Sequence, residues 1–330
     1  DEGKAQRSRL AAAVHYFHQL PDATPRAIAE RIRENGIEVL LDLDGYRRAR
    51  MPEVFAYRAA PVQVNWMAYP GTTGAAYMDY VIADRIVLPD ALRPFFDERA
   101  VYLPRCFQST DVTRVVGIPP PREVCGLPPK PAVVYVCFNA SFKLASRSFM
   151  RMLRVLSGVP GSVLWLLRGP GRTAERLRDR AQAFGIDPAR LIFMPKLPHM
   201  DYMAMYRHAD LFLDNEVYNA HTTASDALWA GCPVLTRLGE AFAGRVAGSL
   251  NCHLGMPEMN VQSDDEYVEC AIAHGLDAEL RQCTRDKLAR RRDESGLFDM
   301  AAFAADFAEL LGRLAAHHHA GGVPGDFVDT

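Results

Sequence analysis

Short apolar segments alternate with amphipathic ones from residue 133 to residue 236. The apolar segments are Val133–Cys137, Val163–Leu167, Leu191–Met194, Leu211–Leu213 and Val234–Thr236. The segments between them predict helices at Ser146–Val155, Ala174–Phe184, His199–His208 and Ser225–Ala230. Strands that are apolar along their whole length are typically buried on both faces of a sheet. The alternation therefore predicts an α/β lobe in which helices cover both faces of a parallel sheet.

The rest of the chain divides around a proline-rich stretch. Residues 117–131 contain two proline clusters, which stiffen a chain and block helices. We therefore expect residues 1–118 to form part of a first lobe, residues 119–131 a linker, and residues 132–330 a second lobe with C-terminal helices. Those helices are predicted at Asp265–Ala273, Asp277–Arg292 and Met300–Ala316.

The first lobe has fewer clear elements. A helix is predicted at Pro25–Asn35, where Thr24 can cap the N-terminus and Pro25 suits the first turn. Strands are predicted at Ile37–Leu43, Pro61–Met67 and Tyr80–Val87. Three strands are too few for a complete nucleotide-binding lobe, and the first residue is Asp rather than Met. We therefore expect the first lobe to be incomplete in this chain.

Composition excludes several classes of protein. Of the 330 residues, 49% are hydrophobic, which argues against a mainly disordered chain. The net charge of −2 does not support binding to nucleic acid or to an anionic membrane. The longest apolar run, Ala132–Phe138, is far shorter than the roughly 18 residues that a membrane span needs. Seven scattered cysteines without a Cys-x-x-Cys pair favour reduced thiols in the cytoplasm.

Polar segments follow the predicted strands of the second lobe, and ligands of such sheets bind at the carboxyl ends of the strands. His221, Thr222 and Thr223 follow the fourth strand and open a helix. The free N–H groups, the two hydroxyls and the positive end of the helix dipole suit a diphosphate. The alternative is that Thr222 or Thr223 only caps the helix.

Two charged residues accompany this segment. Asp226 lies about one helical turn beyond Thr223, where its carboxylate could accept hydrogen bonds from a ribose, or could simply favour the helix dipole. Lys143 follows the first strand of the lobe and could place its charge on a leaving phosphate. The alternative for Lys143 is a solvated lysine in a loop.

Two motifs of the first lobe have structural explanations. Tyr69, Pro70, Gly71 and Thr72 follow a strand and form a tight turn that can bring backbone amides close to a ligand. Asp42-Leu43-Asp44 has the Asp-x-Asp spacing of metal-dependent sugar transferases, but it ends a buried strand and runs into Gly45. We therefore interpret it as a strand-end turn and predict no metal site.

Taken together, the motifs resemble one family. They are Tyr69-Pro70-Gly71-Thr72-Thr73-Gly74, Met78-Asp79-Tyr80, the segment Ser162–Arg168 and, above all, the segment His221–Pro233. In this order and spacing they are similar to the catalytic region of O-linked N-acetylglucosamine transferases, glycosyltransferase family 41. The similarity extends from about Asp42 to about Leu311. The arginine-rich composition indicates a bacterial relative.

The resemblance implies a GT-B fold with two Rossmann-like lobes. It implies an inverting, metal-independent transfer of N-acetylglucosamine from UDP-N-acetylglucosamine to Ser or Thr hydroxyls of proteins. No further cofactor is implied. Tetratricopeptide repeats that bring protein substrates, and the residues near the acceptor, are expected upstream of residue 1.

The resemblance also implies roles for individual residues. Lys143 and the segment His221–Thr223 would contact the diphosphate, and Asp226 the ribose. The backbone of Leu197, the ring of Tyr202 and the neighbouring Pro198 would surround uracil. The chain departs from the family at Ala140, His199 and Met205, where glutamine, lysine and arginine are common, and at Ala68, where glycine is common.

Three alternatives remain open, and the departures at Ala140, His199 and Met205 bear on the last of them. One is a related transferase that uses a GDP-sugar, as plant-type O-fucosyltransferases do, although the intact His-Thr-Thr segment with Asp226 favours UDP. Another is a UDP-N-acetylglucosamine epimerase with a similar fold. The third is a catalytically silent scaffold that binds nucleotide without transferring sugar.

Overall fold

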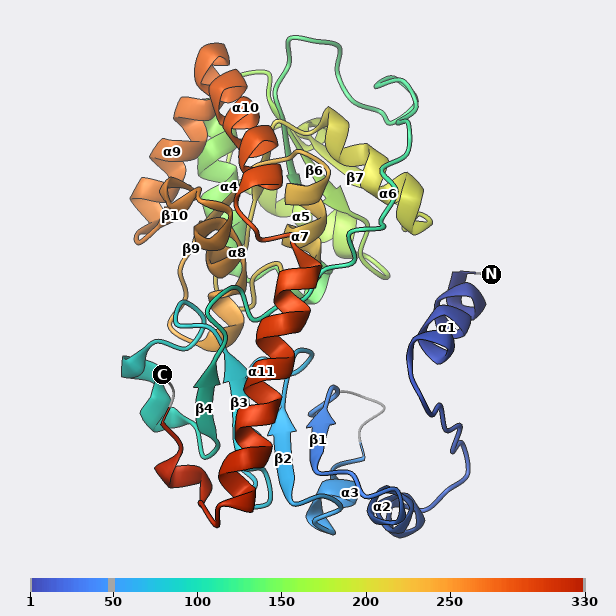
Figure 1. Cartoon of the computed structure of the whole chain (residues 1–330). Coiled ribbons are helices and arrows are strands. Elements are labelled where there is room, and N and C mark those ends of the chain that lie inside the picture. Colours follow the sequence, from blue (N-terminus) through green and yellow to red (C-terminus); the bar gives the residue numbers. More distant parts are fainter. Residues whose placement is uncertain (1, 47–50, 329–330) are drawn as a thin grey trace.

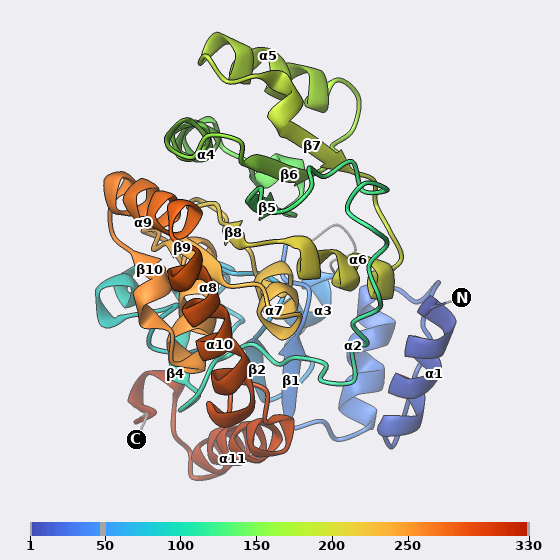
Figure 2. The same cartoon turned by 90° about the horizontal axis from the view of Figure 1, so that it is seen from above.

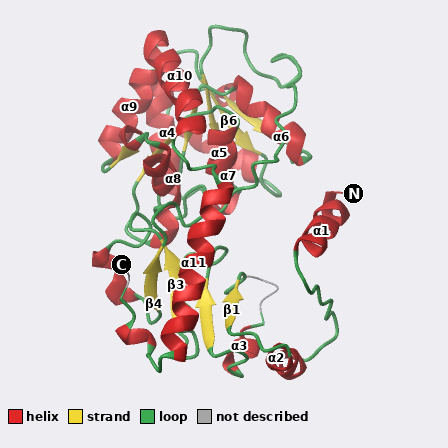
Figure 3. Ribbon diagram, in the orientation of Figure 1, coloured by secondary structure: helices red, strands yellow, loops and turns green. Residues whose placement is uncertain are grey.

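Two parallel β-sheets, one above the other in Figure 1 and drawn in yellow in Figure 3, organise the chain. The computed structural model describes residues 2–46 and 51–328. The first sheet has the order β1-β2-β3-β4, with strands β1 (Val39–Asp42), β2 (Val62–Asn65), β3 (Tyr80–Ala83) and β4 (Arg99–Tyr102). The second sheet has the order β10-β9-β8-β5-β6-β7. Its strands are β5 (Val134–Cys137), β6 (Val163–Leu167), β7 (Leu191–Met194), β8 (Leu211–Leu213), β9 (Val234–Arg237) and β10 (Asn260–Val261).

Helices cover both faces of the second sheet. The helices of the described residues are α1 (Glu2–Ala13), α2 (Pro25–Glu34), α3 (Pro52–Ala56), α4 (Ser146–Gly158), α5 (Thr173–Ala183), α6 (His199–Met205), α7 (Thr222–Trp229), α8 (Val246–Leu254), α9 (Asp264–Leu276), α10 (Ala278–Glu294) and α11 (Met300–His319). Seen from above, α4 and α9 lie on one face of the sheet, and α6 and α7 on the other (Figure 2). Among the described residues, no helix has both the length and the apolar character needed to cross a membrane.

The predicted α/β architecture is confirmed. The five strands predicted between residues 133 and 236 are β5 to β9, and all their neighbouring pairs are parallel. Thr24 caps α2, since its hydroxyl accepts a hydrogen bond from the N–H of Ala27 at 3.3 Å. The helix predicted to reach His208 ends at Met205 and continues as a short 3₁₀ turn.

Sequence analysis missed α1, α3, α8, β4 and β10, and the last three have clear physical reasons. β4 begins at the charged Arg99 and has only four residues, so the first sheet has four strands rather than the predicted three. α8 is buried over most of its surface and contains Gly248, so it lacks the polar face that marks an amphipathic helix. β10 has two residues, too few for any periodic pattern.

The C-terminal helix α11 packs on the first sheet (Figure 1). The ring of Trp66, just after β2, lies 4.3 Å from that of Phe307 and 6.2 Å from that of Phe303, measured between centroids. Leu310 and Leu314 of the same helix are buried in this cluster. The sequence placed this helix with the second lobe, because helical periodicity identifies an apolar face but not the surface that it covers. The predicted boundaries of the linker, at residues 119 and 131, stay a prediction.

A buried carboxylate joins the two lobes. Asp84 follows β3 and is 1% exposed. One of its oxygens accepts hydrogen bonds from the N–H groups of Ile86 and Val87, at 2.9 and 3.0 Å. The other accepts from the N–H of Phe107 at 3.0 Å and from the hydroxyl of Ser249, on α8, at 2.6 Å. Asp84 thus holds the loop after β3 and the segment after β4 against α8 of the second lobe.

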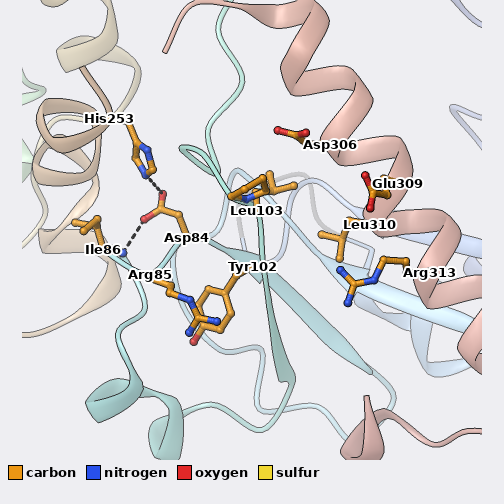
Figure 4. A pocket seen from close by; sticks show the side chains of 11 residues that line it. Asp84, Arg85, Ile86, Tyr102, Leu103, His253, Asp306, Glu309, Leu310 and Arg313 are labelled. Atoms are coloured by element: carbon orange, nitrogen blue, oxygen red, sulfur yellow. Dashed lines mark hydrogen bonds and ion pairs between the residues drawn. The ribbon is translucent and has the colours of Figure 1, made fainter. Parts of the chain in front are cut away.

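Asp84 also lines a cavity of about 350 Å³ where the lobes meet (Figure 4). His253 of α8 approaches it from the second lobe, with Nε2 4.0 Å from the Asp84 carboxylate. Asp306 and Arg313 of α11 line the opposite side. α11 and α8 therefore converge on the same point of the first lobe.

We expect Asp84→Asn to lower the free energy of unfolding by about 2–4 kcal/mol. An amide nitrogen cannot accept the two hydrogen bonds that one carboxylate oxygen now accepts, and each buried donor left unsatisfied costs about 1–3 kcal/mol. Chemical denaturation followed by fluorescence measures the change. Asp97→Asn, at an exposed position nearby, is the control and should change stability little. Equal stability of Asp84→Asn and the unaltered protein would show that this carboxylate does not join the lobes.

Candidate functional site at the switch point of the second sheet

The order of the second sheet places a topological switch point between β5 and β8. From β5 the chain builds β6 and β7 on one side, and then returns to build β8, β9 and β10 on the other. The loops after β5 and β8 therefore diverge to opposite faces, and ligands bind at such switch points. The segments that sequence analysis selected, with Lys143 after β5 and Asn219–Thr223 after β8, lie at this switch point.

Lys143 bridges the two loops. It ends a 3₁₀ turn, Ser141–Lys143, and its Nζ donates to the carbonyl of Asn219 at 3.0 Å. The same Nζ lies 3.8 Å from the centroid of the Tyr218 ring. Burial lowers the pKa of the Lys143 ammonium to about 8, although the nearby Asp214 carboxylate opposes this shift. Lys143 is thus a half-buried cation held at the switch point, and the alternative of a solvated loop lysine does not fit its surroundings.

Asp214, the first residue after β8, ties three strand ends together. It is fully buried. One carboxylate oxygen accepts from the side-chain amide of Asn139 at 3.0 Å and from the N–H of Ala220 at 2.8 Å. The other accepts from the Thr236 hydroxyl at 2.8 Å. Burial raises the pKa of Asp214 to about 6. Sequence analysis did not single out Asp214, although an acidic residue directly after a wholly apolar strand was a usable signal.

His221 stands between Lys143 and the start of α7. Its Nε2 lies 3.0 Å from the carbonyl of Ala243, so Nε2 carries the proton and donates. Burial and the charge of Lys143 lower the pKa of His221 to about 3. The imidazole is therefore neutral at physiological pH, and its Nδ1 remains an acceptor.

The N-terminus of α7 lies at the same switch point and has no side-chain cap. His221 is the N-cap residue, and its side chain makes no capping hydrogen bond. Thr222 and Thr223 are the first two helical residues, so the alternative in which a threonine caps this helix is wrong. The first N–H groups of a helix and its dipole attract anions. This helix start and Lys143 together form an anion-binding arrangement.

Asp226, one turn into α7, is held from two sides. Its carboxylate forms an ion pair with Arg114, and both side chains are buried, with 7% and 8% exposed. The Nε2 of His199, at the start of α6, lies 3.4 Å from the other carboxylate oxygen. Sequence analysis predicted Asp226 and His199 at one site but missed Arg114. Arg114 lies far from α7 in sequence, and no local pattern marked it.

The other predicted nucleotide residues lie in the loop between β7 and α6, in α6 itself and after β5. The Tyr202 ring lies 5.9 Å from the Phe138 ring and 6.0 Å from the His199 ring, between centroids. Leu197 is half-buried and Pro198 exposed, whereas Met205 is buried with its sulfur 3.9 Å from Cys125 of the linker. Ala140 is half-buried and precedes the turn that ends at Lys143.

The Tyr69–Gly74 loop forms its own set of contacts in the first lobe. Thr72 donates from its hydroxyl to the buried Glu98 carboxylate at 2.6 Å, and Thr73 donates from its N–H at 2.6 Å. Gly45 has φ +53°, and a Cβ there would come within 2.3 Å of Tyr69. The hydrogen bonds found for this loop remain inside the first lobe. Tyr69, Pro70, Gly71 and Thr72 therefore stay a prediction as ligand residues.

The Asp-x-Asp motif is a turn, as predicted. One oxygen of the Asp42 carboxylate accepts from the N–H groups of Asp44 and Gly45, both at 2.9 Å. Within residues 2–46 and 51–328, no three His, Cys, Asp or Glu side chains gather as a metal-ligating set.

Comparison with known proteins decides the family. The family model for glycosyl transferase family 41 matches residues 1–117 and 112–307. The chain belongs to glycosyl transferase family 41. It is similar to a probable UDP-N-acetylglucosamine–peptide N-acetylglucosaminyltransferase of Arabidopsis thaliana, SEC, with 33% identity over 97% of this chain and 34% of the relative. The corresponding enzyme of Caenorhabditis elegans shares 26% identity over 97% of this chain and 38% of its own length.

Solved structures agree with this family. The chain resembles the K341M mutant of the Thermobaculum terrenum O-GlcNAc transferase with a TM-score of 0.84 and 29% identity, over 94% of this chain and 59% of that one. The likeness to the glycosyltransferase WaaG, with a TM-score of 0.51 and 16% identity, shows the fold alone. The chain has the GT-B fold, as predicted. It spans about a third of the length of the curated relatives it matches.

We expect the Lys143 ammonium to titrate with a midpoint of about 8 in the ligand-free protein. Burial disfavours the charged form, so the proton is lost at lower pH than the usual lysine value of about 10.4. NMR of the protein with isotopically labelled lysine side chains follows the midpoint, and the spectrum of Lys143→Met assigns the signal. A midpoint near the usual value would place Lys143 in solvent.

Proposed function

We propose that the protein is an inverting, metal-independent glycosyltransferase that moves N-acetylglucosamine from UDP-N-acetylglucosamine to Ser or Thr hydroxyls of proteins. Family membership and the activity named for the two curated relatives support this proposal. The observation that supports it most is the convergence of Lys143, the start of α7 and Asp226 at one switch point. That arrangement suits the charge and shape of a nucleoside diphosphate.

In this proposal the leaving group determines what each residue does. Negative charge grows on the β-phosphate as the glycosidic bond breaks, and Lys143 and the first N–H groups of α7 stabilise that charge. His221 is neutral and its Nε2 proton is donated to Ala243, so it adds no positive charge to the site. Leu197, Pro198 and Tyr202 hold uracil, with Ala140, His199 and Met205 around the nucleotide, and Asp226 holds the ribose.

The acceptor hydroxyl attacks the sugar from the face opposite the leaving diphosphate, which inverts the configuration. Tyr69, Pro70, Gly71 and Thr72 approach the sugar from the first lobe in this proposal, since the strands of that lobe point toward the second lobe (Figure 1). The proposal assigns no general base within the chain.

We further propose that the acceptors are proteins brought by tetratricopeptide repeats outside this chain. A cytoplasmic location in a bacterium fits the seven free cysteines and the low net charge. Neither nucleic acid nor a membrane surface is proposed as a partner.

Calorimetry of the intact protein with UDP, GDP and UDP-N-acetylglucosamine, followed by a peptide transfer assay, tests the proposal. We expect UDP to bind more tightly than GDP, and Asp226→Ala to weaken UDP binding about tenfold or more through lost hydrogen bonds to the ribose. Unchanged UDP affinity in Asp226→Ala would show that Asp226 does not bind the ribose. UDP binding without sugar transfer would identify a nucleotide-binding scaffold, and a preference for GDP a GDP-sugar transferase.

Transfer should continue in the presence of a metal chelator. Lys143 and α7 already provide positive charge for the diphosphate, and Asp42 is engaged in a turn. The rate of sugar transfer is compared with EDTA, with EDTA plus excess manganese, and without additions. A loss of activity that manganese restores would contradict the proposed chemistry.

Lys143→Met should lower the transfer rate about 100-fold or more while weakening UDP-sugar binding less. The reason is that the β-phosphate becomes more negative in the transition state than in the bound substrate. Lys143→Arg should not restore full activity, because a planar guanidinium places its charge differently from a compact ammonium. The control is Lys287→Met. Lys287 lies on α10, remote from the switch point, and pairs with Glu258. Near-normal turnover of Lys143→Met, in a protein whose unaltered form is active, would exclude Lys143 from the phosphates.

A further inference from the structure

Arg114 reaches from the segment that joins the lobes into the second lobe. Its Nη1 pairs with the Asp226 carboxylate, and its Nη2 lies 3.3 Å from the Ser225 hydroxyl. Its carbonyl accepts from the indole N–H of Trp229 at 3.2 Å, and its guanidinium lies 5.6 Å from the centroid of that indole ring. The guanidinium is thus fixed at both its ends, unlike that of a mobile surface arginine.

A second contact runs beside this one. The hydroxyl of Thr110, in the same segment, lies 3.0 Å from the Ser225 hydroxyl, and both residues are buried. Residues 110–114 are therefore held against the first turns of α7. Arg114 is therefore held in a fixed position relative to α7, the helix whose N-terminus lies at the predicted diphosphate site.

We propose that Arg114 is a positioning residue that orients the Asp226 carboxylate toward a ribose and so sets a preference for ribonucleotides over 2′-deoxyribonucleotides. This inference rests on the proposed function, because it needs a uridine nucleotide at the switch point. A carboxylate has about four acceptor positions on its two oxygens. Arg114 occupies one of them on Oδ1, so acceptor positions remain on both oxygens for the neighbouring 2′ and 3′ hydroxyls.

Arg114 suits this role for an electrostatic reason. A buried carboxylate without a partner favours its neutral form, which would accept less strongly from a ribose. Arginine keeps its charge at all relevant pH values and binds carboxylates with fixed geometry. His199, at 3.4 Å and with 44% of its side chain exposed, cannot replace it, because its charge depends on protonation and it is less constrained.

A ratio of affinities tests this role. We would measure dissociation constants of UDP and 2′-deoxy-UDP by calorimetry for the intact protein and for Arg114→Met, Arg114→Lys and Asp226→Ala. In the unaltered protein we expect UDP to bind at least several-fold more tightly than 2′-deoxy-UDP. In Arg114→Met we expect UDP binding to weaken about tenfold, 2′-deoxy-UDP binding to weaken less, and the ratio to fall toward one.

Matched variants separate positioning from general damage. Arg122→Met removes an arginine of the linker, which bonds to the carbonyl of Ala132, and should leave the ratio unchanged. Arg114→Lys keeps the charge but lacks the planar fork that holds the carboxylate in one orientation, so its ratio should lie between those of the unaltered protein and Arg114→Met. The double variant Arg114→Met/Asp226→Ala should have the same ratio as Asp226→Ala alone, since both changes act through one carboxylate.

Each outcome has a distinct meaning. If Arg114→Met weakens both nucleotides equally, or if a folded Arg114→Lys retains the full ratio, the positioning role is overturned while UDP binding stands. If Arg114→Met does not fold, the ratio of Arg114→Lys decides. Failure of the unaltered protein to bind UDP would overturn the proposed function and this inference with it.

Discussion

The site depends on the buried carboxylate of Asp214. It accepts hydrogen bonds from Asn139 after β5, from Ala220 ahead of α7 and from Thr236 in β9, and so fixes three strand ends with one side chain. Burial disfavours the charged form of this carboxylate, and its pKa is raised to about 6. The donors around it, and the ammonium of Lys143 nearby, compensate for lost hydration. Loosening Asp214 would release the loop from which α7 begins, and with it the anion-binding geometry.

Positive charge at the switch point comes from groups of different kinds. Lys143 supplies a full charge whose pKa burial has lowered to about 8, and the start of α7 supplies partial charges that do not titrate. His221 contributes no charge, because burial and Lys143 keep it neutral. An anion bound at this switch point, as proposed, would meet a cation that is already partly desolvated, so less reorganisation would be needed when charge develops on a phosphate.

The two lobes are joined by long-range contacts that position the site without forming it. Asp84 accepts from Ser249 of α8, and α11 leaves the second lobe to pack its aromatic residues against Trp66 of the first. Arg114 and Thr110 connect the joining segment to α7. The helix at the proposed diphosphate site is thus attached both to its own sheet and to the chain that links the lobes.

The sequence by itself determined the alternating strands and helices of the second lobe, because strands buried on both faces must be apolar throughout. It also predicted which strand-end loops form the candidate site, since Lys143, His221–Thr223 and Asp226 differ from ordinary loop residues in type and spacing. Only the tertiary structure decided that Arg114 pairs with Asp226, that Asp214 joins three strands, and that α11 covers the first sheet. Each of these depends on which surfaces meet across long separations in sequence, and neither periodicity nor local spacing records that.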